Sequence, residues 1–169
     1  FYKPTYAADG TIEEFAILAE VPSKIERQWV KNLDDYPAQS VIVTENTEFG
    51  NLYLIEVARG CGRHCRFCMA GYCFRNPRVR SLDKIHQAVM DANQYRNKVG
   101  LMGAAISDYP QIDELCTDIL GLDMHLSVAS LRADSLTEGL VHALAVSGHR
   151  TITLAPEAAS VKLREVINK

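Results

Sequence analysis

The chain has 169 residues, of which 47% are hydrophobic and 23% charged, the proportions of an ordinary soluble globular domain with one core. Its 18 basic and 21 acidic residues give a net charge of -3. This charge excludes a protein that coats nucleic acid with a uniformly basic surface, but it does not exclude a local basic site. The apolar runs are short and interrupted by charged residues or glycine, so we expect no membrane span. The chain begins at Phe1 without a charged-then-apolar leader, and we expect an N-terminal portion to be missing.

Residues 1–51 differ in composition and hydrophobic pattern from the rest of the chain. They contain prolines, among them Pro22 and Pro37, and one alternating stretch from Ile12 to Val21. This composition is typical of irregular chain and edge strands rather than of a domain. We therefore predict a lead-in over residues 1–51 with one or two edge strands.

From residue 52 onward, short apolar runs alternate with amphipathic helical patterns. The expected strands are residues 52–57, 99–106, 125–128 and 151–154. The expected helix signals are a cap at Ser81, Pro110 in a first turn, a capping box from Ser135 to Glu138, a stop at Gly148 and a cap at Ser160. Alternation of strands and helices with full-length crossovers predicts a parallel α/β fold.

Each expected helix has one apolar face. These faces are Ile85, Ala88, Val89 and Ala92; Ile112, Leu115, Ile119 and Leu120; Leu140, Val141 and Leu144; and Leu163, Val166 and Ile167. Four βα units fill residues 52–169, whereas a complete eightfold barrel takes about 250 residues. We therefore predict a partial parallel (β/α) barrel whose later strands are missing. The alternative is a complete, small four-stranded α/β domain.

Three of the five cysteines, Cys61, Cys65 and Cys68, lie within eight residues of one another. Cys73 follows closely and Cys116 stands alone. This crowding indicates metal chemistry in a reducing compartment, with the cytoplasm as the default.

The cysteines follow the first expected strand directly, where parallel α/β folds place their active sites. Gly60 and Gly62 allow the backbone to bend tightly there. Three thiolates on a cubane [4Fe–4S] cluster leave one iron without a protein ligand, and that iron can bind a small molecule.

The spacing Cys61-x3-Cys65-x2-Cys68, with Phe67 immediately before the third cysteine, resembles the cluster-binding motif of the radical S-adenosyl-L-methionine (radical SAM) enzymes. The resemblance covers residues 52–169 and implies a radical SAM core, a [4Fe–4S] cluster, S-adenosyl-L-methionine and an electron donor such as ferredoxin or flavodoxin. In the family, an electron from the reduced cluster cleaves the cofactor into methionine and a 5′-deoxyadenosyl radical, which abstracts hydrogen from a substrate. No catalytic side chain is assigned, and the substrate stays open.

The resemblance also assigns cofactor contacts after each strand. Phe67 corresponds to the aromatic near the adenine, with a core aromatic as the alternative. Met102-Gly103-Ala104-Ala105 stands where the family has a Gly-Gly-Glu segment, so only backbone contacts from Gly103 and Ala104 are expected.

The contacts expected after the third and fourth strands are polar. Ser130 and Arg132 correspond to the segment that contacts the cofactor. The neighbouring Asp134 and Ser135, and Asp108 after the second strand, are interpreted as caps of the helices that follow them. Glu157 suits the ribose hydroxyls or the methionine moiety. Lys169 matches a cation for the methionine carboxylate, with a frayed chain end as the alternative.

Pro22-Ser23, residues 46–50 and the Arg78-x-Arg80-Ser81 segment resemble members with an upstream cobalamin-binding domain. That resemblance extends the implied cofactors to cobalamin, although no cobalamin-binding residues occur in the chain.

Residues 58–80 contain no acid and six arginines: Arg59, Arg63, Arg66, Arg75, Arg78 and Arg80. These cations would favour the reduced form of a cluster, attract an anionic substrate or an RNA phosphate, or form a solvated face whose acids come from elsewhere in the fold.

Two other functions stay open. One is an RNA-modifying enzyme similar to the methylthiotransferases, although no recognisable RNA-binding domain is present. The other is a non-catalytic interaction module held by zinc, with His64 or Cys73 as the fourth ligand beside the three clustered cysteines.

Overall fold

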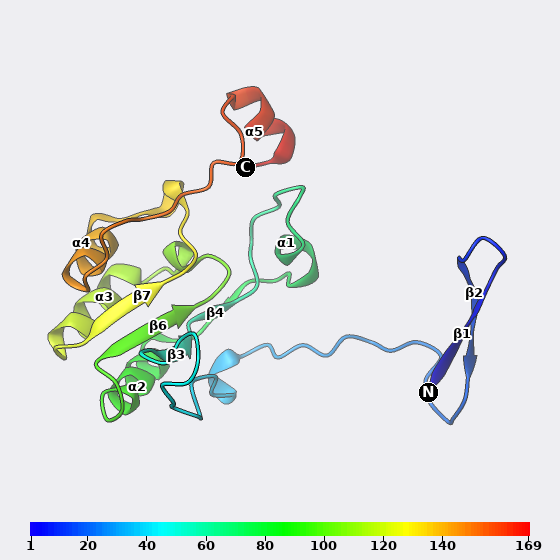
Figure 1. Cartoon of the computed structure of the whole chain (residues 1–169), viewed down its shortest axis with the longest axis horizontal. Coiled ribbons are helices and arrows are strands. Elements are labelled where there is room, and N and C mark those ends of the chain that lie inside the picture. Colours follow the sequence, from blue (N-terminus) through cyan, green and yellow to red (C-terminus); the bar gives the residue numbers. More distant parts are fainter. The chain divides into compact units, whose positions relative to one another are not determined.

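The computed structural model describes residues 1–169 as two compact units, Phe1–Val30 and Lys31–Lys169. In the first unit, β1 (Tyr2–Tyr6) and β2 (Ile12–Ile17) form an antiparallel hairpin (Figure 1). Gly10, with φ of +84°, lies in the connecting turn, where a left-handed backbone favours glycine. Both strands fall within residues 1–51, where one or two edge strands were expected, but they pair with each other in a sheet of their own.

The second unit contains a parallel sheet of three strands in the order β3-β6-β7. The strands are β3 (Tyr53–Glu56), β6 (Lys98–Met102) and β7 (His125–Val128). β3 lies within the predicted range 52–57 and β7 coincides with 125–128, whereas β6 begins one residue before the predicted range 99–106 and already ends at Met102. The mixed α/β class with a parallel sheet is therefore confirmed, and closure into a barrel stays a prediction.

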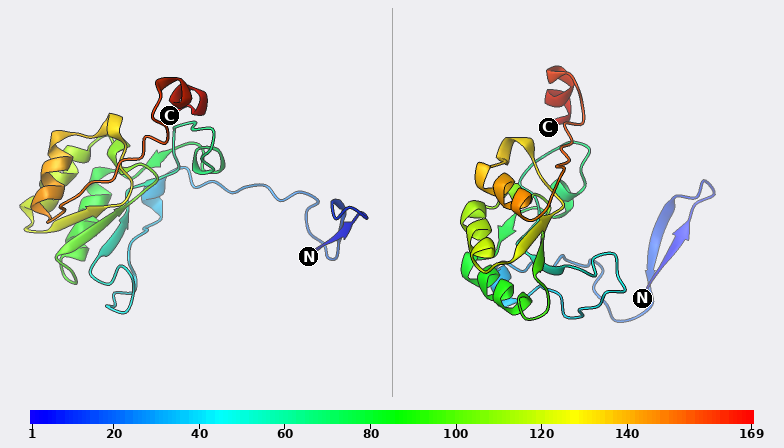
Figure 2. Two further views of the ribbon diagram at one scale, coloured as in Figure 1. Left: turned by 45° about the horizontal axis from the view of Figure 1, so that its top comes forward. Right: turned by 60° about the vertical axis from the view of Figure 1, so that its left-hand side comes forward.

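Helices α2 (Leu82–Ala92), α3 (Ile112–Gly121) and α4 (Glu138–Val146) cover one face of this sheet (Figure 2). The predicted face of α2 is confirmed, because its four apolar residues are all buried. Ile112, Leu115 and Ile119 are buried on α3, with Cys116 beside them. On α4 the buried residues are Leu140, Ala143 and Leu144, whereas Val141, expected there, is 39% exposed.

The remaining elements are short. They are η1 (Leu33–Asp35), β4 (Ala58–Arg59), α1 (Ala70–Cys73), β5 (Arg78–Val79), η2 (Ile106–Asp108), η3 (Ala133–Ser135) and α5 (Val161–Ile167). None of the helices is both long enough and apolar enough to cross a bilayer.

The predicted fourth strand, residues 151–154, is wrong: this segment forms no ladder with β7, and Ile152 and Leu154 are exposed. A β-branched pattern becomes a strand only where a neighbour supplies hydrogen bonds and apolar cover. Helix α5 nevertheless forms after it, with Ser160 accepting from the Leu163 N–H at 3.2 Å.

Three predicted caps are also wrong: Ser135, Asp134 and Asp108. Asp134 lies inside the η3 turn and pairs with Arg132 at 2.9 Å instead of capping α4. Thr137, not Ser135, caps α4, accepting from the Leu140 N–H at 3.2 Å, because a 3₁₀ turn comes first and delays the helix. Ser135 instead donates to the Ser107 hydroxyl at 2.9 Å. Asp108 caps nothing, since α3 begins after Gln111 without a side-chain cap. Ser81 does cap α2, and Gly148, with φ of +84°, follows the end of α4 as expected.

Candidate functional site

The three clustered cysteines lie in one closed loop, residues 60–77, called the cysteine loop below. Its base is closed by antiparallel pairing of β4 with β5. The loop folds tightly on itself, because a Cβ at Gly60 would lie 2.0 Å from the Phe74 carbonyl oxygen. A Cβ at Gly71 would lie 2.4 Å from the Arg63 carbonyl oxygen. The sequence therefore provides a compact turn in which only glycine fits at these two crossings.

The thiols of this loop form no disulfide and differ in exposure. Cys65 is 7% exposed, and Cys61 and Cys68 are partly exposed. The Cys68 N–H donates to the Cys65 carbonyl at 3.0 Å, and the Arg63 N–H donates to Cys61 Sγ at 3.4 Å. The second of these contacts is an N–H···S hydrogen bond, which suits a thiolate that ligates iron.

The chemistry of these donors suits an iron–sulfur cluster. Cys61, Cys65 and Cys68 lie within eight residues of one another in one loop, and thiolates are the donors that hold such clusters. Their side chains are not gathered as a ready-made site for a metal ion. By donor chemistry the three residues fit a [4Fe–4S] cluster, and the zinc alternative stays open.

The cysteine loop lies at the carboxyl edge of the parallel sheet, beside the loops that follow β6 and β7. The Val57 N–H donates to the Met102 carbonyl at 2.9 Å, which ties the end of β3 to the end of β6. The Ile106 N–H donates to the Ser130 carbonyl at 3.1 Å and joins the other two loops. Residues from three successive βα units therefore meet at one edge.

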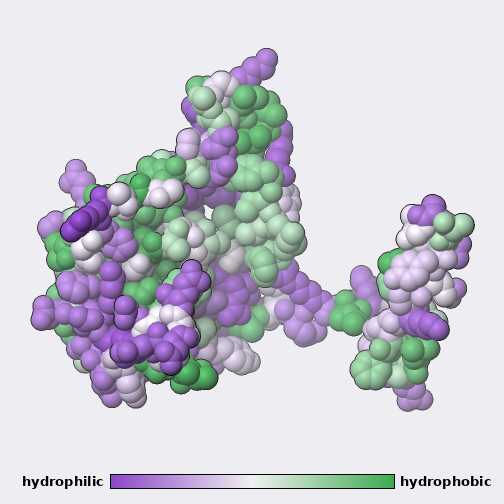
Figure 3. Space-filling model, in the orientation of Figure 1, coloured by the Kyte–Doolittle hydropathy of each residue, from purple (hydrophilic) through white to green (hydrophobic).

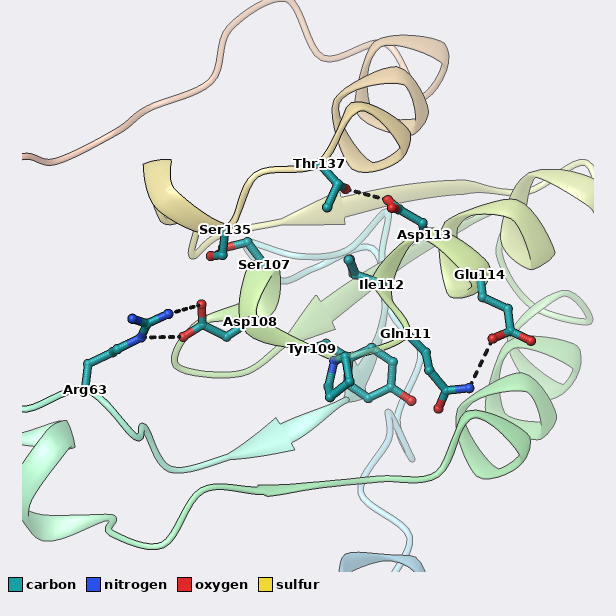
Figure 4. A pocket seen from close by; sticks show the side chains of 11 residues that line it. Arg63, Ser107, Asp108, Tyr109, Gln111, Ile112, Asp113, Glu114, Ser135 and Thr137 are labelled. Carbon is teal, nitrogen blue, oxygen red and sulfur yellow. Dashed lines mark hydrogen bonds and ion pairs between the residues drawn. The ribbon is translucent and has the colours of Figure 1, made fainter.

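Four charged side chains, Arg63, Asp108, Arg132 and Asp134, connect these three loops and are called the four-charge network below. Arg63 donates to both Asp108 oxygens at 3.2 Å, and its Nη1 lies 3.5 Å from Asp134 Oδ2. Arg132 pairs with Asp134 at 2.9 Å and approaches Asp108 at 3.7 Å. Figure 4 shows the Arg63–Asp108 pair at one end of an open groove of about 660 Å³.

The four-charge network shifts the pKa values of three of its members. Burial raises the pKa of Asp108, but hydrogen bonds and charge from its partners, chiefly Arg63, outweigh burial and bring the pKa below its ordinary value. The hydrogen bond from Arg132 lowers the pKa of Asp134. The hydrogen bonds to Asp108 raise the pKa of Arg63. These three shifts all favour the charged forms of Asp108, Asp134 and Arg63 at neutral pH.

The last residues of the chain, at the end of α5, also contact the cysteine loop. The Arg66 N–H donates to the Ile167 carbonyl at 2.9 Å, and Asn168 Nδ2 donates to the His64 carbonyl at 3.0 Å. Asn168 suits this position because its φ of +56° is left-handed, which asparagine tolerates. Helix α5 accordingly lies close to the loop in Figures 1 and 2.

This contact brings together three residues that were predicted from separate segments. Lys169 Nζ lies 5.7 Å from the centre of the Phe67 ring and 3.4 Å from Glu157 Oε1. Glu157 has φ of +66°, a left-handed conformation that costs a non-glycine residue about 1 kcal/mol. Strain of this kind is often found at functional sites, where neighbouring contacts hold it.

Residues 55–169 match the family model described as the Radical SAM superfamily. The chain belongs to the radical SAM superfamily. It is also 39% identical over 150 residues to the uncharacterized protein MJ0966 of Methanocaldococcus jannaschii, covering 86% of this chain and 33% of that protein. The chain thus spans about one third of the length of this curated relative. Radical SAM proteins are generally enzymes that use a [4Fe–4S] cluster, S-adenosylmethionine and a reductant.

The other predicted contacts of this radical SAM core fall into separate places. Arg132 lines a cavity of about 450 Å³ together with Pro156 and Lys169. Gly103 and Ala104 line a different hollow, of about 580 Å³, beside Gly60. Ser130 lines neither and joins the edge through its carbonyl group. The structure therefore unites Phe67, Glu157, Lys169 and Arg132 on one side and leaves Gly103 and Ala104 on another.

The arginines of residues 58–80 are partly compensated by acids from elsewhere in the radical SAM core. Arg59 and Arg80 both pair with Glu56, at 2.8 and 2.7 Å, and Arg63 belongs to the four-charge network. Burial raises the pKa of Glu56, but the hydrogen bonds from the two arginines outweigh it and the pKa falls. Arg66 and Arg75 form no ion pair with a carboxylate within 4.0 Å. Acids from outside the segment thus pair with three of the six arginines, but of these only Arg59 and Arg63 are solvated, because Arg80 is 5% exposed.

Sequence reasoning missed Asp108, Asp134 and Asn168 as partners of the cysteine loop. One signal was present, because a run of arginines without acids predicts that acids arrive from other loops. Asp108 and Asp134 follow the second and third strands and so lie at the same edge as the cysteines. The position of Asn168 beside His64 had no comparable signal, since it depends on where α5 packs.

Proposed function

We propose that residues 52–169 form the catalytic core of a radical SAM enzyme in which Cys61, Cys65 and Cys68 ligate a [4Fe–4S] cluster, with residues 1–51 as its lead-in. The observation that carries this proposal is the set of free thiols in one closed loop at the carboxyl edge of a parallel sheet. Thiolate donors are those that iron–sulfur clusters require. When bound and reduced, the cluster supplies the electron that divides S-adenosylmethionine into methionine and a 5′-deoxyadenosyl radical.

The chain's own residues prepare the site for this chemistry. Burial keeps water away from Cys65, and the Arg63 N–H stabilises negative charge on the Cys61 sulfur. Arg66 and Arg75 add positive charge in the same segment, which favours the more negative, reduced state of a cluster.

We assign cofactor binding to the side on which Phe67, Glu157 and Lys169 meet. Lys169 is the cation for the methionine carboxylate, and Glu157 accepts from the ribose hydroxyls or the methionine amino group. In the structure these two side chains pair with each other, so each is compensated before the cofactor arrives and exchanges partners when it binds.

Further contacts come from the neighbouring loops. Arg132 lines the adjoining cavity as a second cation. Ser130, which lies outside that cavity, is assigned a polar contact to the cofactor from the same loop. Gly103 and Ala104 contribute close backbone approach at their own hollow. The reductant is an electron donor such as ferredoxin or flavodoxin, and the substrate is unassigned. Neither similarity extends to cobalamin, for which the chain offers no ligand set.

Anaerobic reconstitution of the chain, followed by iron and sulfide analysis, tests the cluster. The expected result is about four irons and four sulfides per chain. Addition of S-adenosylmethionine should then change the electron paramagnetic resonance spectrum of the reduced protein, because one iron keeps an open position. One zinc without sulfide, or a spectrum that the cofactor leaves unchanged, would overturn the proposal.

A further inference from the structure

Arg63 connects the cysteine loop to the loops that follow β6 and β7. Its backbone N–H contacts Cys61 Sγ at 3.4 Å, and its carbonyl oxygen lies against Gly71 in α1. Its side chain leaves the loop and meets Asp108 and Asp134. A movement of Arg63 therefore displaces the first cysteine and α1 together.

Asp108 is held more firmly than Arg63. It ends η2 between two buried neighbours, Ser107 and Tyr109. Ser107 Oγ accepts from the Arg132 N–H at 2.9 Å, and the Tyr109 hydroxyl donates to the Arg80 carbonyl at 3.1 Å. The Asp108 side chain is 25% exposed, against 43% for Arg63. The anchored partner is thus the aspartate, and the positioned partner is the loop.

We propose that Asp108 is a positioning residue that, through the bidentate pair with Arg63, holds the cysteine loop in the conformation that receives the cluster. The ordering of the loop is a property of the metal-free chain, and only its consequence for iron retention rests on the proposed function. Asp134 contributes less, because its pair with Arg63 is longer, at 3.5 Å, and it is more exposed. A bidentate arginine–carboxylate pair fixes orientation as well as position, which a single contact does not.

Hydrogen exchange on the metal-free full chain, measured by mass spectrometry, tests this role directly. Asp108→Asn keeps the shape of the side chain and removes its charge, so amides of residues 60–77 should exchange about fivefold faster, the size expected for a partly exposed pair. Arg63→Met should also accelerate exchange of these amides, because it removes the other side chain of the pair. The double variant should exchange no faster than Arg63→Met alone, because Arg63→Met already removes the pair with Asp108.

The matched control is Asp118→Asn, which removes the same charge from a pair with His86, at 3.6 Å, between α3 and α2. This variant should leave exchange in the cysteine loop unchanged. Unaltered loop exchange in Asp108→Asn, or additive effects in the double variant, would overturn the proposal. Thermal unfolding of every variant confirms that exchange reports the loop and not the whole fold.

Iron retention supplies the second measurement. After reconstitution, Asp108→Asn and Arg63→Met should release iron to a chelator about fivefold faster than the parent chain, because both variants lack the Arg63–Asp108 ion pair. The control Asp118→Asn should release iron at the rate of the parent chain. If the parent chain assembles no cluster, the proposed function fails, whereas the exchange experiment still decides the role of Asp108. If the parent chain assembles a cluster and iron release is equal in all variants, the positioning role fails alone.

Discussion

The helix-covered face of the sheet and its carboxyl edge are held together by different forces. On the face, α2, α3 and α4 bury aliphatic side chains such as Ile85, Leu115 and Leu144. At the edge, charge pairs and loop hydrogen bonds make the contacts, and several large apolar residues are exposed: Phe67, Met69, Tyr72 and Phe74 on the cysteine loop and Val161, Leu163 and Val166 on α5. Figure 3 shows hydrophobic surface, in green, in the region of the cysteine loop and α5.

Because of this difference, we expect the stability of the fold to depend on the helix layer and the binding chemistry to depend on the carboxyl edge. Apolar burial is spread over many contacts and does not depend on salt, whereas ion pairs at a partly exposed edge depend on single atoms and on screening. Substitutions in the helix layer should therefore change the free energy of unfolding. Substitutions at the edge should change metal and cofactor binding.

Two buried cysteines give the largest and most direct test of this separation. Cys65→Ala in the cysteine loop should abolish iron and sulfide binding after anaerobic reconstitution, as should Cys61→Ala and Cys68→Ala. Cys116→Ala should retain the full complement, because Cys116 lies in the core on α3 and burial raises its pKa to about 12, which keeps it a neutral thiol.

Cys73→Ala is the second control, since Cys73 is exposed at the end of α1. It too should keep its iron. Iron loss from Cys73→Ala equal to that from Cys65→Ala would mean that the ligands are wrongly assigned.

A core substitution should produce the opposite pattern. Leu115→Ala removes a fully buried side chain from α3 and should lower the free energy of unfolding by about 2–4 kcal/mol in a denaturant titration of the metal-free chain. Val141→Ala on α4, at an exposed position, should cost less than about 1 kcal/mol. Equal costs for the two variants would contradict the described helix faces.

Removal of the Glu157 carboxylate should separate cofactor binding from cluster binding. Glu157→Ala should weaken the affinity of the reconstituted protein for S-adenosylmethionine about tenfold, since one charged hydrogen-bonding group is lost, while the iron content stays the same. Calorimetric titration measures the affinity. An unchanged affinity would remove Glu157 from the site.

The smallest expected effect is on the pH dependence of stability. The folded-state pKa of Asp108 lies below its ordinary value of 3.8, so its stabilisation is present above pH 3.8 and is lost as pH falls through the lower folded-state pKa. Asp108→Asn should therefore lower the free energy of unfolding at pH 6 by less than about 1 kcal/mol. At the acidic limit the parent chain and the variant should converge, and a difference that grows toward low pH would contradict this sign.

The helix layer was predictable because its pattern is local. The spacing of Ile85, Ala88, Val89 and Ala92 places them on one helical face whatever surrounds the helix, and all are buried. The position of the cysteines after the first strand was predictable for a similar reason, since parallel folds expose loops at the carboxyl edge.

The errors arose where the outcome depends on a distant partner. Asp108 has the local pattern of a helix cap, yet Arg63 from another loop provides a stronger, charged interaction. Residues 151–154 have the pattern of a strand but no neighbouring ladder. The meeting of Phe67 with Lys169 likewise depends on the docking of α5, which no local pattern encodes.

The contact between Asn168 and His64 spans 104 positions in the chain, and this separation has a consequence for assembly during synthesis. The thiols leave the ribosome well before the segment that later contacts their loop. At a translation rate of about 5–20 residues per second, the interval is on the order of ten seconds. Iron delivery in the cell thus has a period in which the cysteines are translated and the contact of α5 with their loop is not yet made.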